Sequence, residues 1–462
     1  MLIFESLLTE GIAQLSYLVG DTSTGSAAVV DPRPDVDVYL EMAERHGVSI
    51  THVLETHIHA DFMSGARELA HRTGTAKIYC SHEGEPSYGF EHEAIRDGTR
   101  FPFGKVALTT RHTPGHTPEH VSFELAENDR PDEPWGVLTG DSLFVGSAGR
   151  PDLLGEQATP ELTEKLFQTL KDYYLRLDDG VMIYPCHGAG SACGADIGER
   201  PASTIGHERR GNPFLQFDDL ERFQAFIEEG APPVPSHYPK LKKVNGQGPP
   251  VLGNLPGCPG LPPQSFQEKI DQGRYQLLDV RHMLAFGGGH IAGAVNIGDR
   301  AELSVWAADM LESEVPTLLV LHDDTDRDRV LRLLLRTGVV EHAGYLAGGM
   351  TAWANTGRAM QRLPQRTVQE LHDNRGDFEV LDVRSDGEWR RGHIPGARHC
   401  FVGTLRDSTP ELDRDKPLVT YCASGYRASI AASLLQSRGF NKVHNVPGSW
   451  QAWTSAGYPV EE

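Results

Sequence analysis

The stretch that decides the fold of the N-terminal half is Thr56–Phe62, THIHADF, which follows a predicted strand at Ile50–Glu55. Three later loops carry similar side chains after apolar runs: HTPGH at His112–His116, LTGD at Leu138–Asp141 and YPCHG at Tyr184–Gly188. An α/β scaffold presents functional groups at strand ends and in loops. We therefore expect imidazoles and carboxylates from these four loops to converge on one divalent metal.

The surrounding pattern predicts a multidomain α/β protein. A hairpin at Tyr17–Val30 and a helix at Val36–His46 begin an alternation of strands and helices that reaches Pro185, which is typical of a layered α/β domain. Prolines and glycines crowd residues 231–263 and predict an interdomain linker there. We place the first domain at 1–230.

An internal repeat follows the predicted linker. LDVR at Leu278–Arg281 and GHIAGA at Gly289–Ala294 recur as LDVR at Leu381–Arg384 and GHIPGA at Gly392–Ala397. Short Val/Leu-rich strands alternate with helices in each copy. This pattern predicts two small α/β domains with parallel sheets, at 264–360 and 364–462.

The second copy contains a cysteine loop, CASGYR at Cys422–Arg427, between the strand Leu418–Tyr421 and a helix predicted at Ala428–Ser437. Backbone N–H groups at a helix N-terminus stabilise a thiolate and the persulfide formed from it. Arg427 adds positive charge for an anion such as sulfite or thiosulfate. The Cys-x4-Arg spacing is one residue shorter than the phosphatase loop and favours sulfur transfer. We expect Cys422 and Arg427 to be catalytic.

The first copy has HDDTDR at His322–Arg327, which places His322 opposite Cys422 and three carboxylates where an anion would bind. This copy therefore lacks both a nucleophile and an anion pocket. We expect it to be catalytically inactive and to serve a structural or docking role.

Composition narrows the function classes. The formal net charge of −21 argues against nucleic acid and anionic membranes as partners. Six irregularly spaced cysteines indicate a reducing compartment with functional thiols. The N-terminus has no basic segment before an apolar run, and no apolar stretch approaches the roughly 20 residues of a membrane span. We expect a cytoplasmic protein.

The four metal-type loops resemble those of the metallo-β-lactamase superfamily over about residues 1–230. The resemblance implies an αββα sandwich, in which two sheets pack face to face between helices and loops at one edge hold the metal. The family motif is His-x-His-x-Asp-His, and Phe62 occupies its last position here. Phenylalanine cannot ligate, so we expect one metal rather than two, with Asp61 and His187 beside it.

Within this superfamily THIHAD, TGDSLF at 139–144, GRPD at 149–152 and GAGSACG at 188–194 resemble the persulfide dioxygenase branch. The resemblance implies one Fe(II) held by His57, His116 and Asp141, with His59 close to it but not a ligand. Two imidazoles and one carboxylate leave open positions that suit Fe(II) and O2 chemistry. The same set could hold zinc and a hydroxide, and ligand types alone do not decide between them.

Two further positions follow from the same resemblance. It implies that Arg150 helps to hold the thiol carrier of the substrate; the alternative is a structural contact with Asp152. Cys193 lies in the Gly/Ala/Ser-rich loop, and we expect it either to handle persulfide sulfur or to be a buried small residue.

The second copy resembles a rhodanese domain, and the whole chain resembles bacterial fusions of a persulfide dioxygenase with an inactive and an active rhodanese. The resemblance implies Fe(II)-dependent oxidation of a low-molecular-weight persulfide by O2 to sulfite, then sulfur transfer through Cys422 to give thiosulfate. It also implies a homo-oligomer, either a dimer or a tetramer. Two alternatives remain: a zinc thioesterase of the glyoxalase II type with a rhodanese module, and a sulfur-carrier or redox-sensing scaffold that does not turn over.

Overall fold

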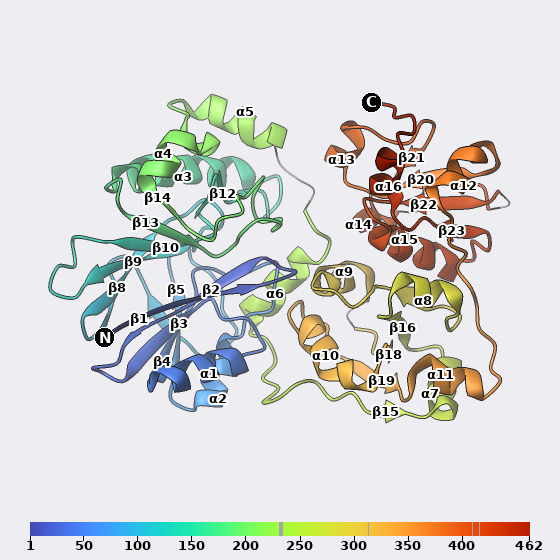
Figure 1. Cartoon of the computed structure of the whole chain (residues 1–462). Helices are drawn as coiled ribbons and strands as arrows, with labels where there is room; N and C mark the ends of the chain where they lie inside the picture. The colour runs from blue at the N-terminus through green and yellow to red at the C-terminus, as the bar shows by residue number, and fades with distance from the viewer. Residues whose placement is uncertain (231–233, 313, 409, 415) are drawn as a thin grey trace. The chain divides into compact units, whose positions relative to one another are not determined.

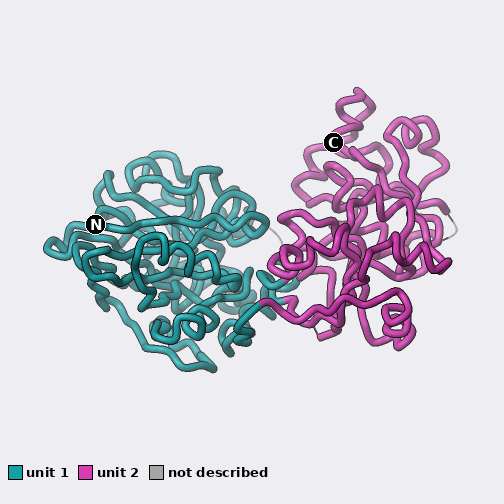
Figure 2. Tube along the Cα trace, turned by 60° about the horizontal axis from the view of Figure 1, so that its bottom comes forward, with its two compact units in different colours: residues 1–254, 335–338 teal, residues 255–334, 339–462 magenta. Residues whose placement is uncertain are grey.

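The structure is a computed structural model that describes residues 1–230, 234–312, 314–408, 410–414 and 416–462, with its elements labelled in Figure 1. The chain forms two compact units, coloured separately in Figure 2. Unit 1 comprises Met1–Asn254 with Leu335–Gly338, and unit 2 comprises Leu255–Leu334 with Val339–Glu462. Apart from Leu335–Gly338, both sequence repeats therefore belong to unit 2.

Unit 1 contains two sheets with helices on both outer faces (Figure 1). The first sheet has the strand order β1 (Leu2–Thr9), β2 (Gln14–Asp21), β3 (Ser26–Val30), β4 (Ser49–Leu54), β5 (Lys77–Ser81) and β6 (Glu93–Ile95). The second has the order β14 (Ser203–Thr204), β13 (Met182–Pro185), β10 (Gly136–Gly140), β9 (Val121–Glu127), β8 (Val106–His112) and β7 (Arg100–Phe103). A short hairpin, β11 (Leu143–Phe144) and β12 (Ser147–Ala148), adjoins them.

Strand β2 shows why the sheets and helices stack as layers. Every residue of β2 is buried, because both of its faces are covered. Tyr17 and Val19 join the core between the two sheets, whereas Leu18 joins the core beneath helices α1 (Asp37–His46) and α2 (Ala66–Thr73). The alternation follows from the period of two along a strand.

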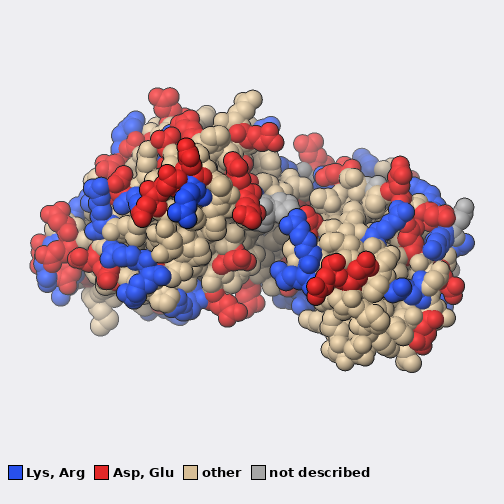
Figure 3. All heavy atoms as spheres, turned by 90° about the horizontal axis from the view of Figure 1, so that it is seen from above, with Lys and Arg blue, Asp and Glu red and all other residues tan. Residues whose placement is uncertain are grey.

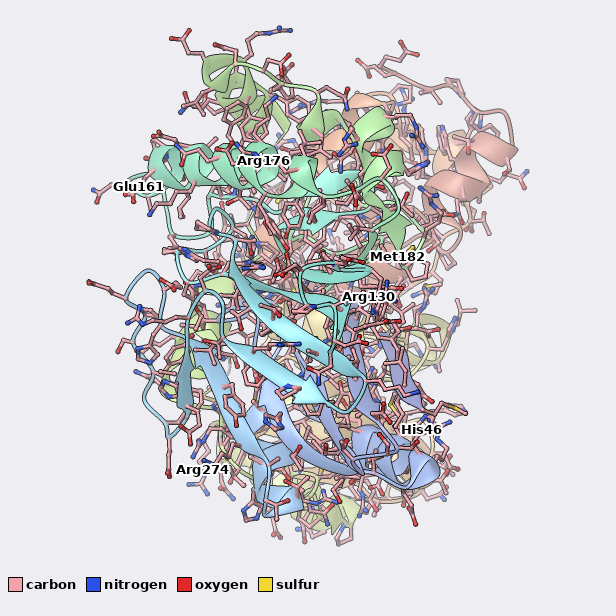
Figure 4. All side chains as sticks on the ribbon, turned by 90° about the vertical axis from the view of Figure 1, so that its left-hand side faces the viewer. His46, Arg130, Glu161, Arg176, Met182 and Arg274 are labelled. Atoms are coloured by element: carbon pink, nitrogen blue, oxygen red, sulfur yellow. The ribbon has the colours of Figure 1, made fainter. Side chains whose placement is uncertain are left out.

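The second sheet is covered by the helices α3 (Thr159–Asp172), α4 (Ile205–Gly211) and α5 (Leu220–Gly230) and by the 3-10 turns η1 (Tyr174–Arg176) and η2 (Pro213–Leu215). In Figure 4, α3 carries the labelled Glu161 near one end and ends close to the labelled Arg176, above the strand that begins at Met182. This arrangement is the αββα sandwich expected from the sequence.

The segment predicted to be a linker contains a helix, α6 (Tyr238–Gln247), that belongs to unit 1. Asn245 on α6 donates hydrogen bonds to the carbonyl oxygens of His59 and Phe62, and the backbone N–H of Ser64 donates to its Oδ1. The predicted linker therefore contains a regular helix, although prolines and glycines crowd its sequence. Pro239 lies in its first turn, where a proline costs no hydrogen bond. Residues 231–233 of the predicted linker lie outside the described residues.

Unit 2 contains one parallel sheet from each repeat, as predicted. The first has the order β15 (Gly260–Leu261), β19 (His342–Leu346), β18 (Thr317–Val320), β16 (Gln276–Asp279) and β17 (Val295–Asn296); the second has β21 (Arg398–His399), β20 (Glu379–Asp382), β22 (Leu418–Tyr421) and β23 (Val443–Asn445). The first repeat has helices α7 (Pro263–Asp271), α8 (Met283–Gly288), α9 (Leu303–Met310), α10 (Arg327–Leu335) and α11 (Gly349–Asn355), with η3 (Asp324–Asp326). The second has α12 (Val368–Asp373), α13 (Asp386–Arg390), α14 (Val402–Leu405), α15 (Tyr426–Ser437) and α16 (Ser449–Ser455), with η4 (Arg375–Asp377).

The repeated motif LDVR has a structural role in both copies. Arg281 binds the carboxylate of Asp279 and the carbonyl oxygen of Gly289, and Arg384 makes the equivalent bonds to Asp382 and Gly392. These bonds tie the end of a strand to the start of the GHIxGA segment. A buried arginine pairs well with a carboxylate because its donors match the two oxygens.

The two repeats share one hydrophobic core because helix α15 has no polar face. All residues from Ala428 to Leu435 are buried, and the core cluster contains side chains from both repeats. A helix that is apolar on all sides must be covered on all sides. Asn296 on β17 of the first repeat accepts a hydrogen bond from Ser429 Oγ at 2.6 Å, and its backbone N–H donates to Ser433 Oγ at 2.8 Å.

None of the described helices is both long and apolar enough to span a membrane. On the face shown in Figure 3, acidic and basic side chains are interspersed on both units rather than gathered into a single basic patch. This distribution agrees with a solvated acidic surface.

The bond network of Asn296 leads to a prediction about stability. Its side chain also donates to the carbonyl oxygens of Asp279 and Arg281, at 3.0 and 2.9 Å. Asn296→Ala leaves these buried groups unpaired, and we expect it to lower the free energy of unfolding of unit 2 by about 3 kcal/mol. Chemical denaturation of the full chain measures the change. Asn355→Ala, at an exposed position on α11, is the control and should change stability by less than about 0.5 kcal/mol; an equal effect of the two variants would contradict the prediction.

Candidate metal centre and cysteine loop

Unit 1 brings His57, His116 and Asp141 together at one end of its sheets. Each is buried, and one ligand atom from each lies within 4.8 Å of the others. The Nε2 atoms of His57 and His116 are 3.8 and 3.6 Å from Asp141 Oδ2. Among the described residues, neither His57 Nε2 nor Asp141 Oδ2 has a hydrogen-bond partner. Buried polar atoms are rarely left unpaired, so these atoms are suited to bind a cation.

Two residues that are not themselves candidate ligands, Thr56 and Asp31, determine which ring nitrogen of His57 carries the proton. Thr56 Oγ1 donates its proton to Asp31 Oδ2 at 3.0 Å and lies 2.9 Å from His57 Nδ1. Because the hydroxyl proton is already used, Thr56 Oγ1 accepts from His57 Nδ1–H. The lone pair of His57 is therefore on Nε2, which faces the other two candidate ligands.

His116 is oriented in the same way by a backbone carbonyl. Its Nδ1 donates to the carbonyl oxygen of Arg150 at 2.9 Å, which leaves the lone pair on Nε2. Burial lowers the pKa of both His57 and His116, so both imidazoles are neutral. Two neutral imidazoles and one carboxylate form a set that can hold a divalent metal.

His59 lies beside this set but has different partners. Its ring centroid is 4.2 Å from that of His57, and its Nε2 lies 3.0 Å from Asp31 Oδ1 and 3.2 Å from Glu55 Oε2. Burial alone would lower the pKa of His59, but the two carboxylates outweigh burial and raise it well above the usual value. His59 is therefore an imidazolium held by carboxylates.

His187 bridges two carboxylates. Its Nδ1 donates to Asp141 Oδ1 at 2.7 Å, and its Nε2 forms an ion pair with Asp61 Oδ2 at 2.6 Å. Burial opposes the charge on His187, yet the two carboxylates raise its pKa to about 10. Phe62 is fully buried, and its ring lies 4.4 Å from that of His59. Phe62 thus places a phenyl ring at the position where the family motif has a metal-binding histidine.

The structure places Cys193 next to Asp61 and His187, with one ligand atom of each within 4.8 Å of the others. Burial raises the pKa of the Cys193 thiol well above its usual value, and Sγ lies 3.7 Å from Tyr238 Oη on helix α6. Cys193 is therefore a buried neutral thiol rather than an exposed thiolate.

The guanidinium of Arg150 binds Asp152 in its own loop and Ala192 in the loop that carries Cys193. Nε and Nη2 each donate to Asp152 at 2.7 Å, and Nη1 donates to the carbonyl oxygen of Ala192 at 3.2 Å. The contact with Asp152 is the structural alternative to a role of Arg150 in holding the thiol carrier. Its backbone carbonyl, by contrast, orients His116 directly.

The sequence reasoning missed three groups that support the site. Asp31 binds Thr56 and His59, His120 accepts a hydrogen bond from the backbone N–H of Asp141, and Tyr238 reaches Cys193. Asp31 has a positive φ of 52°, a strained conformation for a non-glycine residue, and such strain is concentrated at functional sites. The Asp-Pro pair that ends β3 was a usable signal for Asp31, whereas Tyr238 lay in a segment predicted to have no regular structure.

In unit 2 the cysteine loop wraps around the N-terminus of α15. Gly425 N–H donates to Cys422 Sγ at 3.1 Å, and Cys422 N–H donates to Ser449 Oγ at 3.1 Å. Gly425 has a φ of 107°, and a Cβ there would lie 3.0 Å from Pro447 Cα. The loop conformation therefore requires glycine at this position.

The guanidinium of Arg427 is paired with the carboxylate of Glu388. Its Nη1 and Nη2 donate to the two carboxylate oxygens of Glu388, at 2.7 and 2.8 Å. Burial opposes ionisation of Glu388, but Arg427 outweighs it and lowers the pKa of Glu388 to about 2. The positive charge predicted for an anion is thus already paired with a carboxylate.

The loop of the first repeat is closed by carboxylates. Asp323 Oδ1 accepts from the backbone N–H of Thr325 at 2.9 Å, and Asp324 accepts from the backbone N–H of Gly348 at 3.1 Å. His322 is exposed at the position aligned with Cys422. The carboxylates of Asp323 and Asp324 therefore occupy backbone N–H groups that would otherwise be available to bind an anion.

Comparison with known proteins agrees with this architecture. The metallo-beta-lactamase superfamily model matches residues 10–187, and the rhodanese-like domain model matches residues 262–356 and 367–456. A hydroxyacylglutathione hydrolase of Rhodospirillum rubrum is 30% identical over 237 residues, which cover 47% of this chain and 88% of that protein. The chain belongs to the metallo-β-lactamase superfamily. Two rhodanese-like domains follow its metallo-β-lactamase domain.

Two further similarities are informative. The protein named persulfide dioxygenase ETHE1, mitochondrial, from Bos taurus is 29% identical over 207 residues, which cover 43% of this chain and 70% of that protein. A crystal structure of a metallo-β-lactamase from Staphylococcus aureus has a TM-score of 0.66 and 30% identity, and covers 75% of this chain and 99% of that chain. The structural match thus extends beyond the metallo-β-lactamase domain.

The hydroxyl of Thr56 can be tested as the group that orients His57. Thr56→Val keeps the shape of the side chain but removes the acceptor for His57 Nδ1–H, so we expect metal affinity to fall 10- to 100-fold, roughly the effect of losing an outer-shell partner. Competition with a chelator measures the affinity. Thr110→Val is the matched control, because Thr110 is also buried and, among the described residues, its Oγ1 has no hydrogen-bond partner. Unchanged affinity in Thr56→Val would contradict the role.

The Glu388–Arg427 pair predicts a pH dependence. Since folding lowers the pKa of Glu388 from an ordinary 4.5 to about 2, the stabilisation is fully present above about pH 4.5 and is lost as the pH falls toward 2. We expect Glu388→Gln to destabilise unit 2 by about 2 kcal/mol at pH 7 and by progressively less below pH 4.5. Denaturation at a series of pH values checks this, with the exposed Glu312→Gln as control. A difference that does not vary with pH would refute the linkage.

Proposed function

We propose that this protein is a persulfide dioxygenase fused to a sulfurtransferase. Its first unit oxidises the persulfide of a low-molecular-weight thiol with O2 to sulfite and the free thiol. Its second unit transfers sulfane sulfur through Cys422 to sulfite, which gives thiosulfate. The similarity to a protein named persulfide dioxygenase supports the first reaction, and the cysteine loop of the second rhodanese-like domain supports the second.

The observation that carries the proposal is the donor set of His57, His116 and Asp141, in which His57 Nε2 and Asp141 Oδ2 have no hydrogen-bond partner among the described residues. Phe62 has no lone pair to offer at the position where the family motif has a histidine ligand. This favours one metal over a dinuclear hydrolytic centre. A two-histidine, one-carboxylate set with open positions is typical of non-haem Fe(II) oxygenases, and Fe(II) bound there would supply the O2 chemistry.

The residues around this set hold protons in fixed places. Asp31 and Thr56 keep the proton of His57 on Nδ1, and the carbonyl oxygen of Arg150 keeps that of His116 on Nδ1. His59 and His187 are each paired with two carboxylates, so they hold protons beside the ligands without adding net positive charge. We assign to Arg150 the role of holding the loop at 149–152 in place. We propose that Cys193 contacts the persulfide sulfur as a neutral thiol.

The sulfur-transfer step needs no outside oxidant. The Cys422 thiolate attacks the outer sulfur of a persulfide, R–S–SH, and the sulfur–sulfur bond breaks with the electron pair leaving on RS⁻. Sulfite then attacks the outer sulfur of Cys422–S–S⁻, which releases thiosulfate and restores the thiolate. Gly425 N–H points at Cys422 Sγ and stabilises its negative charge, while Arg427 and Glu388 hold the loop in shape.

Metal exchange combined with substrate choice tests the first reaction. We expect the full chain loaded anaerobically with Fe(II) to bind about one iron and to consume O2 with glutathione persulfide, and the Zn(II) form to consume none. His57→Ala and Asp141→Asn should lose the iron and at least 100-fold of the O2 uptake, because each removes a ligand. His71→Ala, at an exposed position on α2, is the control. A zinc-filled protein that hydrolyses a glutathione thioester without consuming O2 would instead identify a thioesterase.

A further inference from the structure

A cleft of about 540 Å³ lies within unit 2, between the cysteine loop and the first repeat. Ser424 and Tyr426 border it from the second repeat, on either side of the Gly425 N–H that contacts Cys422 Sγ. Tyr426 Oη donates to the carbonyl oxygen of Gly298 at 2.9 Å, which holds the two walls together. The shared core around α15 fixes the same arrangement.

The first repeat supplies most of the charged groups in this cleft. Arg300 lies with its Cζ 5.0 Å from the centre of the Tyr426 ring. Its side chain is 55% exposed, and its Nε lies 3.7 Å from Glu302 Oε2. Arg329 binds the carboxylate of Asp299 and lies 3.2 Å from Asp326 Oδ1. The exposed His322, which replaces the cysteine of this copy, also lines the cleft.

Size and charge together define the ligand class. Clefts of roughly 300–1,000 Å³ bind organic molecules of drug size, so an inorganic anion would fill little of this one. The described residues that line it include two arginines and two aspartates, so the lining is balanced in charge; both aspartates contact Arg329. A zwitterion carrying both a carboxylate and an ammonium group matches such a lining, whereas a carrier with several phosphates does not.

We propose that this cleft binds the carrier part of a zwitterionic, amino-acid-like thiol persulfide and delivers its outer sulfur to Cys422. In this proposal Arg300 binds the carrier's carboxylate, and Asp326, which also lines the cleft, binds its ammonium group. The inference rests on the proposed transfer function, and it gives the inactive repeat a role as the specificity wall of the active one. The chemistry is unchanged: R–S–SH and the Cys422 thiolate yield RS⁻ and Cys422–S–SH.

Arg300→Ala in the full chain tests the cleft. We expect the Kd for reduced glutathione, measured by calorimetry, to rise about tenfold because a charge-assisted contact is lost. The rate at which glutathione persulfide loads Cys422, followed by mass spectrometry, should fall by a similar factor. Loading from thiosulfate, which has no carrier, should change less than about twofold. Arg274→Ala is the matched control: Arg274, labelled in Figure 4, lies 5.1 Å from the ring of Tyr275 in the same repeat but outside the cleft.

The possible results distinguish a failure of the proposed carrier site from a failure of the proposed transfer function. Equal glutathione affinity in Arg300→Ala and Arg274→Ala, or an equal loss of loading from both sulfur donors, would overturn the carrier site. Arg300-dependent glutathione binding in a protein whose Cys422 gains no sulfur from either donor would support the site and refute the transfer function. A weaker effect on glutathione than on coenzyme A would contradict the assignment to a zwitterionic carrier.

Discussion

The carboxylate of Asp31 is the contact on which the metal centre depends. It joins the end of β3 to the loop after β4 by accepting from the backbone N–H and the hydroxyl of Thr56, and its Oδ1 also contacts His59 Nε2. A buried carboxylate is costly unless its oxygens are bound, so these partners are held tightly. Through Thr56 the carboxylate sets which nitrogen of His57 carries a proton, and through its charge it keeps His59 cationic.

Buried carboxylates play a comparable organising role in unit 2. Asp279 and Asp382 each bind an arginine two residues later and thereby form the same strand-to-loop joint in both repeats. Glu388 does this for the cysteine loop by binding Arg427. The residue of the first repeat at the position of Glu388 is Ala285, and its loop is closed by Asp323 and Asp324 instead. Loss of the nucleophile thus accompanies a different way of holding the loop.

The features that could be predicted from the sequence are those that depend on residues close together in the chain. Local alternation and repeat spacing predicted a layered α/β domain and two parallel sheets, and α15 begins within two residues of its predicted start. The αββα sandwich itself was implied by the resemblance to the metallo-β-lactamase superfamily. Contacts between distant segments were out of reach: Asp31 with Thr56, Glu388 with Arg427, and Tyr238 with Cys193. No period or spacing encodes such pairs, because folding alone brings them together. Helix α6 was missed for another reason, since Pro239 is tolerated in a first turn.

Unit 1 is proposed to form sulfite and unit 2 to consume it, and this coupling fixes the stoichiometry of the overall reaction. The most direct test measures O2 consumed, glutathione persulfide consumed and thiosulfate formed by the Fe(II)-loaded full chain. The account predicts one O2 and two persulfides for each thiosulfate, and in Cys422→Ser continued O2 uptake with sulfite as the product. Thiosulfate formed without O2 uptake, or formed at an unchanged rate by Cys422→Ser, would contradict it.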